Sequence, residues 1–214
     1  MTTPDTEDRP PADPTESLRL IAEERATAAR ELIPDIRLLS WPWGIAWLIG
    51  FGLLFLRFGP NDRVFVDMPQ WLPLAVLFTL LAVAAVITAT INGRSSRQTV
   101  GRSKYQGMLF GLSWPIAFAT TFTIAVRLSG KLPDDEVGLL WSALAVAVTG
   151  VLYLAGGMLW GGRSMYLVGV WLLAINAAGV IIGPGWHSLI IAVAGSAAMF
   201  VGGAVGHAAV TRRT

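Results

Sequence analysis

The chain has 214 residues, 54% of them hydrophobic, and its mean hydropathy is +0.58. With the 23 glycines included, the apolar share is about 65%, against roughly 45–50% for soluble domains counted in the same way. The absence of cysteine excludes disulfides, thiolate metal sites and cysteine nucleophiles. The net charge is only +2, but nine of the fourteen acidic residues lie within positions 1–40. The two parts of the chain are therefore predicted to meet different solvents.

Residues 1–14 are acidic and proline-rich and lack apolar side chains that could form a core. They are predicted to form a disordered tail and do not resemble a signal peptide. Asp13 has the character of a helix N-cap, with Pro14 at the first helical position. A helix is predicted from about residue 14 to 33, ended by Pro34, within a cytoplasmic segment of residues 15–37.

The predicted N-terminal helix is amphipathic, with a narrow apolar stripe that includes Leu18 and Ile21. Such a stripe fits docking on a partner protein, lying on a membrane surface, or a simply solvated helix. The mixed charge, with several glutamates, favours protein contact. We take Leu18, Ile21 and Arg25 as candidate partner-contact residues.

The remainder, residues 38–214, is predicted to be an all-α bundle of six transmembrane helices. Most of its apolar stretches approach or exceed the ~20 residues that cross a ~30 Å hydrocarbon core. Apart from Arg57 at the end of the first, these stretches contain no Asp, Glu, Lys or Arg. The predicted spans are 41–57, 71–92, 106–126, 137–160, 164–183 and 186–209.

The charges between the spans predict the orientation. The 93–105 loop has four basic residues and no acid, whereas all five acids beyond residue 40 fall on the opposite side. The basic loop is therefore expected in the cytoplasm, with both termini there and the chain in the plasma membrane. Its basic residues are candidate cytoplasmic contacts: Arg94, Arg97, Arg102 and Lys104.

Small residues recur at the GxxxG spacing that lets membrane helices approach closely. These pairs predict packing within the bundle or between two copies, most simply in a homodimer. They are Gly107–Gly111, Gly157–Gly161, Gly179–Gly183 and Gly202–Gly206.

Three polar or helix-breaking residues are candidates for a pathway or hinge. Asn176 needs hydrogen-bond partners in hydrocarbon, so it either joins two helices or lines a polar path. Pro115, after Ser113, is expected to kink the third span, as a hinge or as a packing device. His187 and His207 are expected at opposite membrane interfaces, where they cannot share a metal.

No catalytic constellation is visible: there is no paired aspartate, no HExxH motif and no serine with an evident histidine or lysine partner. The chain is therefore predicted not to be an enzyme, with no cofactor, no metal and no nucleic-acid partner. The spans also lack the carboxylates through which proton-driven carriers couple transport. An energy source, if transport occurs, is expected in another protein.

Six spans, cytoplasmic ends, a leading amphipathic helix and a polar loop after the second span resemble the membrane subunit of ABC-2-type exporters. The resemblance implies a permease-like subunit, two copies of which form the pathway. A separate cytoplasmic ATPase would contact the leading helix and the first cytoplasmic loop. The connection at 183–187 is shorter than the re-entrant helices usual in that family. In its Ala, Gly, Val, Arg and Trp usage the chain also resembles small actinobacterial membrane proteins.

Two other functions fit the same pattern. The bundle could anchor a non-transporting scaffold or sensor whose N-terminal helix recruits a cytoplasmic partner. A passive channel with an uncharged interior is the third hypothesis, although no ring of filter residues can be identified.

Overall fold

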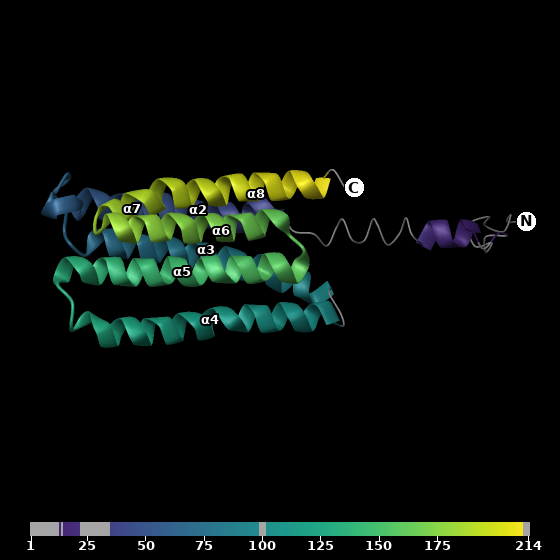
Figure 1. The fold of residues 1–214 in the computed structure, drawn as a ribbon. Coiled ribbons are helices and arrows are strands. Elements are labelled where there is room, and N and C mark those ends of the chain that lie inside the picture. The colour runs from purple at the N-terminus through teal and green to yellow at the C-terminus, as the bar shows by residue number, and fades with distance from the viewer. Residues whose placement is uncertain (1–12, 14, 22–34, 99–101, 212–214) are drawn as a thin grey trace, which may run out of the picture.

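The computed structural model describes residue 13, residues 15–21, residues 35–98 and residues 102–211. Every regular element in these ranges is helical. Six helices are long and apolar enough to cross a membrane, and they lie side by side in one bundle (Figure 1). The expected all-α fold with six spans is confirmed, and the chain has the architecture of a multi-pass membrane protein.

The helices succeed one another with short connections, so neighbours in sequence run in opposite directions (Figure 1). The last span is divided by a π-helical turn, and a short 3₁₀ helix, Pro60–Asp62, follows the first. The spans are α2 Ile36–Arg57, α3 Leu72–Gln98, α4 Arg102–Ser129, α5 Asp134–Trp160, α6 Arg163–Ile182, and α7 Trp186–Ile190 with η3 Ile191–Gly195 and α8 Ser196–Thr211.

The spans differ from the predicted ranges mainly at their ends. The first begins at Ile36 and not at residue 41, because the Asp35 side chain caps the helix by accepting the Arg37 N–H at 2.9 Å. Arg37 thus belongs to the first span and not to the preceding segment. Much of the predicted 93–105 loop is also helical, since charged residues continue a helix beyond its apolar stretch.

A short helix at residues 15–21 is described from the N-terminal segment. Asp13 accepts the Thr15 N–H at 3.0 Å through its side chain, which confirms its predicted capping role. The predicted tail, except Asp13, and the remainder of the predicted amphipathic helix lie outside the described residues.

An inner group of spans, comprising α2, α5, α6 and α7–η3–α8, encloses the core. Its buried side chains include Trp47, Val146, Leu172, Ile191 and Met199. Glycines set the closest approaches in this group. A Cβ at Gly157 would lie 2.6 Å from the Tyr166 backbone nitrogen, so α5 and α6 can meet there only without a side chain.

The outer spans α3 and α4 are attached differently. The α3 helix packs mainly on α2, and α4 packs mainly on α5, at the edge of the bundle (Figure 1). Aromatic residues at four-residue spacing on α4 meet aromatic residues of α5, and the indole N–H of Trp141 on α5 also donates to the Ser129 hydroxyl of α4 at 2.9 Å. The ring pairs of this aromatic ladder are Phe110–Trp160, Trp114–Tyr153 and Phe122–Trp141.

The π-helical turn Ile191–Gly195 interrupts the last span, which the sequence predicted as continuous. A π turn leaves carbonyl groups without their usual α-helical partners. The indole N–H of Trp171 on α6 donates to the Ala194 carbonyl at 3.0 Å, and the Ser196 hydroxyl donates to the Ala192 carbonyl. Both bonds supply hydrogen-bond donors to carbonyls of the π turn, one buried inside the bundle and one exposed on its surface.

The GxxxG pairs divide between packed and open positions. Gly157, Gly179, Gly202 and Gly206 each face another element closely, which fits the predicted packing within the bundle. Gly161 and Gly183 instead adopt positive φ at helix ends, where glycine relieves backbone strain. A Cβ added at Gly107 or Gly111 on α4 would meet no atom of another described element within 4 Å.

Candidate functional site

The candidate site is a polar cluster of Ser142, Asn176 and His187, which joins three helices inside the bundle. His187 lies at the start of α7 and is only 1% exposed. Its Nε2 lies 2.9 Å from Asn176 Oδ1 on α6, and its Nδ1 lies 3.2 Å from Ser142 Oγ on α5. The Asn176 amide also donates to the Ala143 carbonyl at 3.0 Å, which ties α6 to α5 directly.

The hydrogen-bond partners assign the protons of this cluster. Because Asn176 Nδ2 donates to Ala143, its Oδ1 is the atom that faces His187 and can only accept. The Nε2 of His187 therefore carries a proton. In the neutral imidazole Nδ1 is then an acceptor, and the Ser142 hydroxyl is the donor that faces it, although the Gly138 carbonyl at 2.9 Å competes for its single hydrogen. Each side chain thus fixes the orientation of the next.

Glycines around the α6–α7 connection make this geometry accessible. Gly183 and Gly185 adopt positive φ values of 106° and 79° in the tight turn that reverses the chain. On α6, a Cβ at Gly179 would lie 2.8 Å from His187 Cδ2, so a side chain there would push the imidazole out of place. The turn expected at 183–187 is confirmed, and His187 points from it into the protein.

A groove of about 340 Å³ lies beside the cluster, between α5 and α6. Two polar residues line it: Asn176 inside and Glu136 in the first turn of α5. The other walls are apolar and include Leu132, Leu139, Leu140, Leu144, Ala147 and Val180. The polar cluster thus contributes one of its members to an otherwise apolar surface.

No family model, curated protein or solved structure matches this chain.

The pairing of Ser142 with His187 was not predicted, because 45 residues separate them and only the packing of α5 against α7 joins them. A serine bonded to an imidazole is the nucleophile–base half of a hydrolytic triad. Here Ser142 lies inside α5, whose backbone N–H groups bond within the helix. They do not form an oxyanion site beside its hydroxyl, so the geometry favours an interhelical clamp.

The predicted pathway residues do not come together. Asn176 joins helices, as the hydrogen-bonding interpretation expected, and also lines the groove. Ser113 lies on the outer helix α4, where its hydroxyl donates to the Phe110 carbonyl at 2.6 Å. Pro115 is exposed on the same helix, which runs as one element from Arg102 to Ser129.

The candidate partner-contact residues are exposed where the structure describes them. Leu18 and Ile21 are 67% and 45% exposed on the short N-terminal helix, and Arg25 lies outside the described residues. Arg94 and Lys104 are exposed on the adjoining ends of α3 and α4. Arg97 and Arg102 belong to the same helix ends, although their side chains lie outside the described part.

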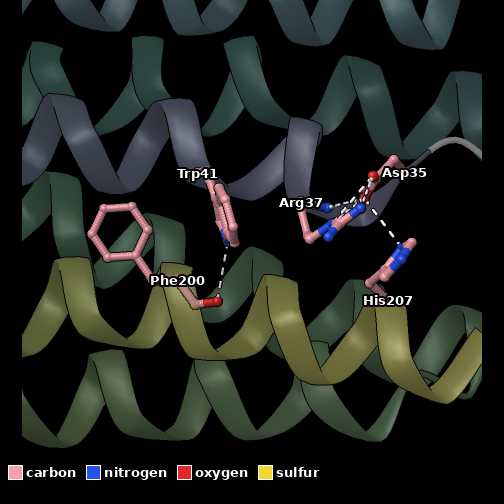
Figure 2. A network of polar contacts seen from close by, with 5 residues as sticks. All are labelled: Asp35, Arg37, Trp41, Phe200 and His207. Atoms are coloured by element: carbon pink, nitrogen blue, oxygen red, sulfur yellow. Dashed lines mark hydrogen bonds and ion pairs between the residues drawn. The ribbon is translucent and has the colours of Figure 1, made fainter.

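A second polar network, not found by sequence reasoning, links the first and last spans at one end of the bundle (Figure 2). The Asp35 carboxylate lies 2.7 Å from Arg37 Nη2 and 3.2 Å from His207 Nδ1. The hydrogen bond with Arg37 lowers the pKa of Asp35 to about 2. Further along, the indole of Trp41 donates to the Phe200 carbonyl at 3.2 Å.

His207, which was expected at a membrane interface, faces Asp35 near the C-terminal end of the last span. His187 and His207 lie at opposite ends of the last span, so they cannot share a metal ion. Within the described ranges, no three His, Asp or Glu side chains gather closely enough to hold one.

Proposed function

We propose that this protein is a non-enzymatic membrane subunit whose basic end binds a separate cytoplasmic protein. The observation that carries the proposal is the pair of helix ends at α3 and α4, which present the exposed Arg94 and Lys104. Arg163, at the start of α6, belongs to the same end of the bundle (Figure 1). By the positive-inside rule this end and both termini would face the cytoplasm, and the membrane would be the plasma membrane.

The lengths of α3 and α4 support a contact role. They have 27 and 28 residues, so at 1.5 Å per residue each is about 40 Å long, against a hydrocarbon core of ~30 Å. The basic residues therefore stand on rigid helix ends that project beyond the membrane. A rigid helical pair loses less conformational entropy on binding than a flexible loop does.

The form of this function that we favour is a permease-like subunit of an ATP-driven transporter, present in two copies. The apolar windows of the six spans offer no relay of carboxylates for coupling transport to protons, so energy would come from the partner. The proposed ATPase would contact the α3–α4 end and the apolar residues Leu18 and Ile21.

The test is recovery of the partner from native membranes with the full chain as bait. We expect an ATPase subunit to co-purify, and the double variant Arg94→Glu, Lys104→Glu to lose it. Arg127→Glu with Lys131→Glu makes the same charge change at the opposite end and should retain it. Recovery of the chain alone, with no effect of nucleotide on its thermal stability, would overturn the transporter form.

A scaffold or sensor is the second candidate, and the closed inner core favours it. Leu172 and Ile191 are fully buried there, and the clamp of Ser142, Asn176 and His187 joins three helices around them. A rigid bundle suits an anchor. Deletion of residues 1–34, which spares the Asp35 cap, should then abolish partner recruitment and leave the bundle folded, whereas ATP-dependent substrate flux in proteoliposomes would exclude this candidate.

A further inference from the structure

We propose that the groove between α5 and α6 binds a cationic amphiphile, with its positive head at Glu136 and a hydrogen-bond acceptor on its apolar body at Asn176. The groove is independent of the proposed partner contact. Its lining residue Glu136 belongs to the first turn of α5, and α5 begins at the opposite end of the bundle from the C-terminal end of α3 and the start of α4 (Figure 1).

The carboxylate at the groove mouth selects for positive charge. Three acids stand in the first turn of α5, where they stabilise the helix dipole. Asp134 and Asp135 are exposed, whereas Glu136 is half-buried and lines the groove. Its carboxylate has no hydrogen-bond or ion-pair partner among the described residues. A ligand cation placed there would gain a charge pair in a partly desolvated position.

Asn176 supplies the second polar contact. The residue is only 7% exposed, and its amide nitrogen spends one N–H on the Ala143 carbonyl. An amide has two such donors, and the described part of the chain offers no partner to the second. His187 holds Oδ1 at 2.9 Å, so the amide cannot rotate to present an acceptor instead. The groove thus offers a fixed donor to a ligand oxygen.

The spacing and volume define the ligand class. Glu136 and Ala143, which bonds Asn176, are seven residues apart on α5, or about 10 Å along the helix axis. The walls between them are leucines, so the connecting part of the ligand is apolar. The volume of about 340 Å³ limits the ligand to a small molecule. A quaternary ammonium whose apolar chain carries a hydroxyl at least about 10 Å from the nitrogen meets these limits, and a ten-carbon chain is long enough.

The test uses the full chain in nanodiscs of zwitterionic lipid and (10-hydroxydecyl)trimethylammonium as the probe, with empty nanodiscs as the background. We expect saturable binding in equilibrium dialysis. Decyltrimethylammonium, which lacks the hydroxyl, should bind about fivefold more weakly, the equivalent of one hydrogen bond of ~1 kcal/mol. Decyl sulfate should not compete. Equal binding of the two cations would refute the Asn176 contact without any variant.

Matched variants then separate the site from general surface charge. Glu136→Gln should weaken both cations about tenfold, and Asp135→Asn, one residue away and outside the groove, should change binding less than twofold. Ala147→Phe, which fills the inner end of the groove, should abolish saturable binding while the unfolding temperature stays near that of the parent. Equal losses in Glu136→Gln and Asp135→Asn, or unchanged binding in Ala147→Phe, would overturn the proposal.

Discussion

The inner and outer spans of this bundle are similar in composition but are held by different contacts. Among the 18 most apolar consecutive residues of each span, 39% are buried in the last span and 6% in α4. Lipid tails are as apolar as leucine, so hydrophobicity alone does not drive one helix onto another in a membrane. The inner spans use glycine contacts, several interhelical hydrogen bonds and a π turn, whereas α4 is held mainly by an aromatic ladder and by one hydrogen bond from Trp141 to Ser129. The number of close glycine contacts and interhelical hydrogen bonds, and not hydrophobicity, therefore distinguishes the inner spans from α4.

The largest effect should come from adding a side chain at an inner glycine. Gly157→Leu would place its side chain against the backbone of Tyr166, so we expect a loss of about 3 kcal/mol by overpacking. Gly111→Leu on α4 makes the same change in open space and should cost little. Unfolding in mixed detergent micelles measures both. Equal losses would show that α4 is packed as tightly as α5.

The polar cluster should give the next largest effect. His187→Leu removes the partner of Asn176 Oδ1 and leaves this buried oxygen unpaired at a cost of about 2 kcal/mol, whereas the Ser142 hydroxyl can still donate to the Gly138 carbonyl. The double variant with Asn176→Leu should cost less than the sum of the single variants, because the unpaired amide is then gone. A double-mutant cycle on unfolding free energies measures this coupling. Strict additivity would mean that the two side chains act independently.

Removing the hydrogen bond at the π turn should cost less stability than the two changes above, but more than a matched change at the interface of α5 with the outer helix α4. Trp171→Phe removes the donor to the Ala194 carbonyl, and we expect a loss of about 1 kcal/mol. Trp160→Phe keeps an aromatic ring against Phe110 and breaks no hydrogen bond with the described residues. It should be nearly neutral in the same unfolding assay. A larger loss of unfolding free energy in Trp160→Phe than in Trp171→Phe would contradict a stabilising role for the hydrogen bond at the π turn.

The smallest effect concerns the end of the bundle where Asp35 meets Arg37 and His207. The pKa of Asp35 is lowered from 3.8 to about 2, so its charged form stabilises the folded state above pH 4. That contribution is lost as the pH falls through about 2. Asp35→Asn keeps a capping side chain but not the charge, and it should cost less than about 1 kcal/mol at pH 7. A stability difference between the two proteins that does not shrink between pH 4 and pH 2 would contradict this.

The sequence was sufficient for the spans because their signal is local. Long uncharged stretches bounded by charges mark each helix, and even the α6–α7 turn follows from its Gly183 and Gly185. The helix ends were less predictable, since Asp35 caps α2 through a contact that hydropathy does not register. Charged residues also continue α3 and α4 beyond their apolar stretches, and hydropathy does not register this continuation either.

The candidate site depended on contacts between distant residues. Asn176 stood out, because a lone amide in an apolar helix needs a partner. Its partner His187 was placed at the membrane interface, since position along the chain does not show which way a turn residue points. Ser142 had no signal, because a serine in a helix commonly bonds its own backbone, and here the Gly138 carbonyl lies 2.9 Å from its hydroxyl oxygen as an alternative acceptor to His187. Only three-dimensional packing joins the three.

The π turn Ile191–Gly195 also fixes the phase between the two halves of the last span. A π turn contains one residue more than the α-helical turn it replaces, and in an α-helix one residue corresponds to about 100° of rotation. His187 on one side of it bonds Asn176 of α6, while on the other side Gly203 faces Ser40 and Trp41 of α2 and Gly202 faces Val168 of α6. Deleting a single residue between 191 and 195 would restore a regular helix and swing one of these faces into lipid. The extra residue lets one helix serve two different neighbours.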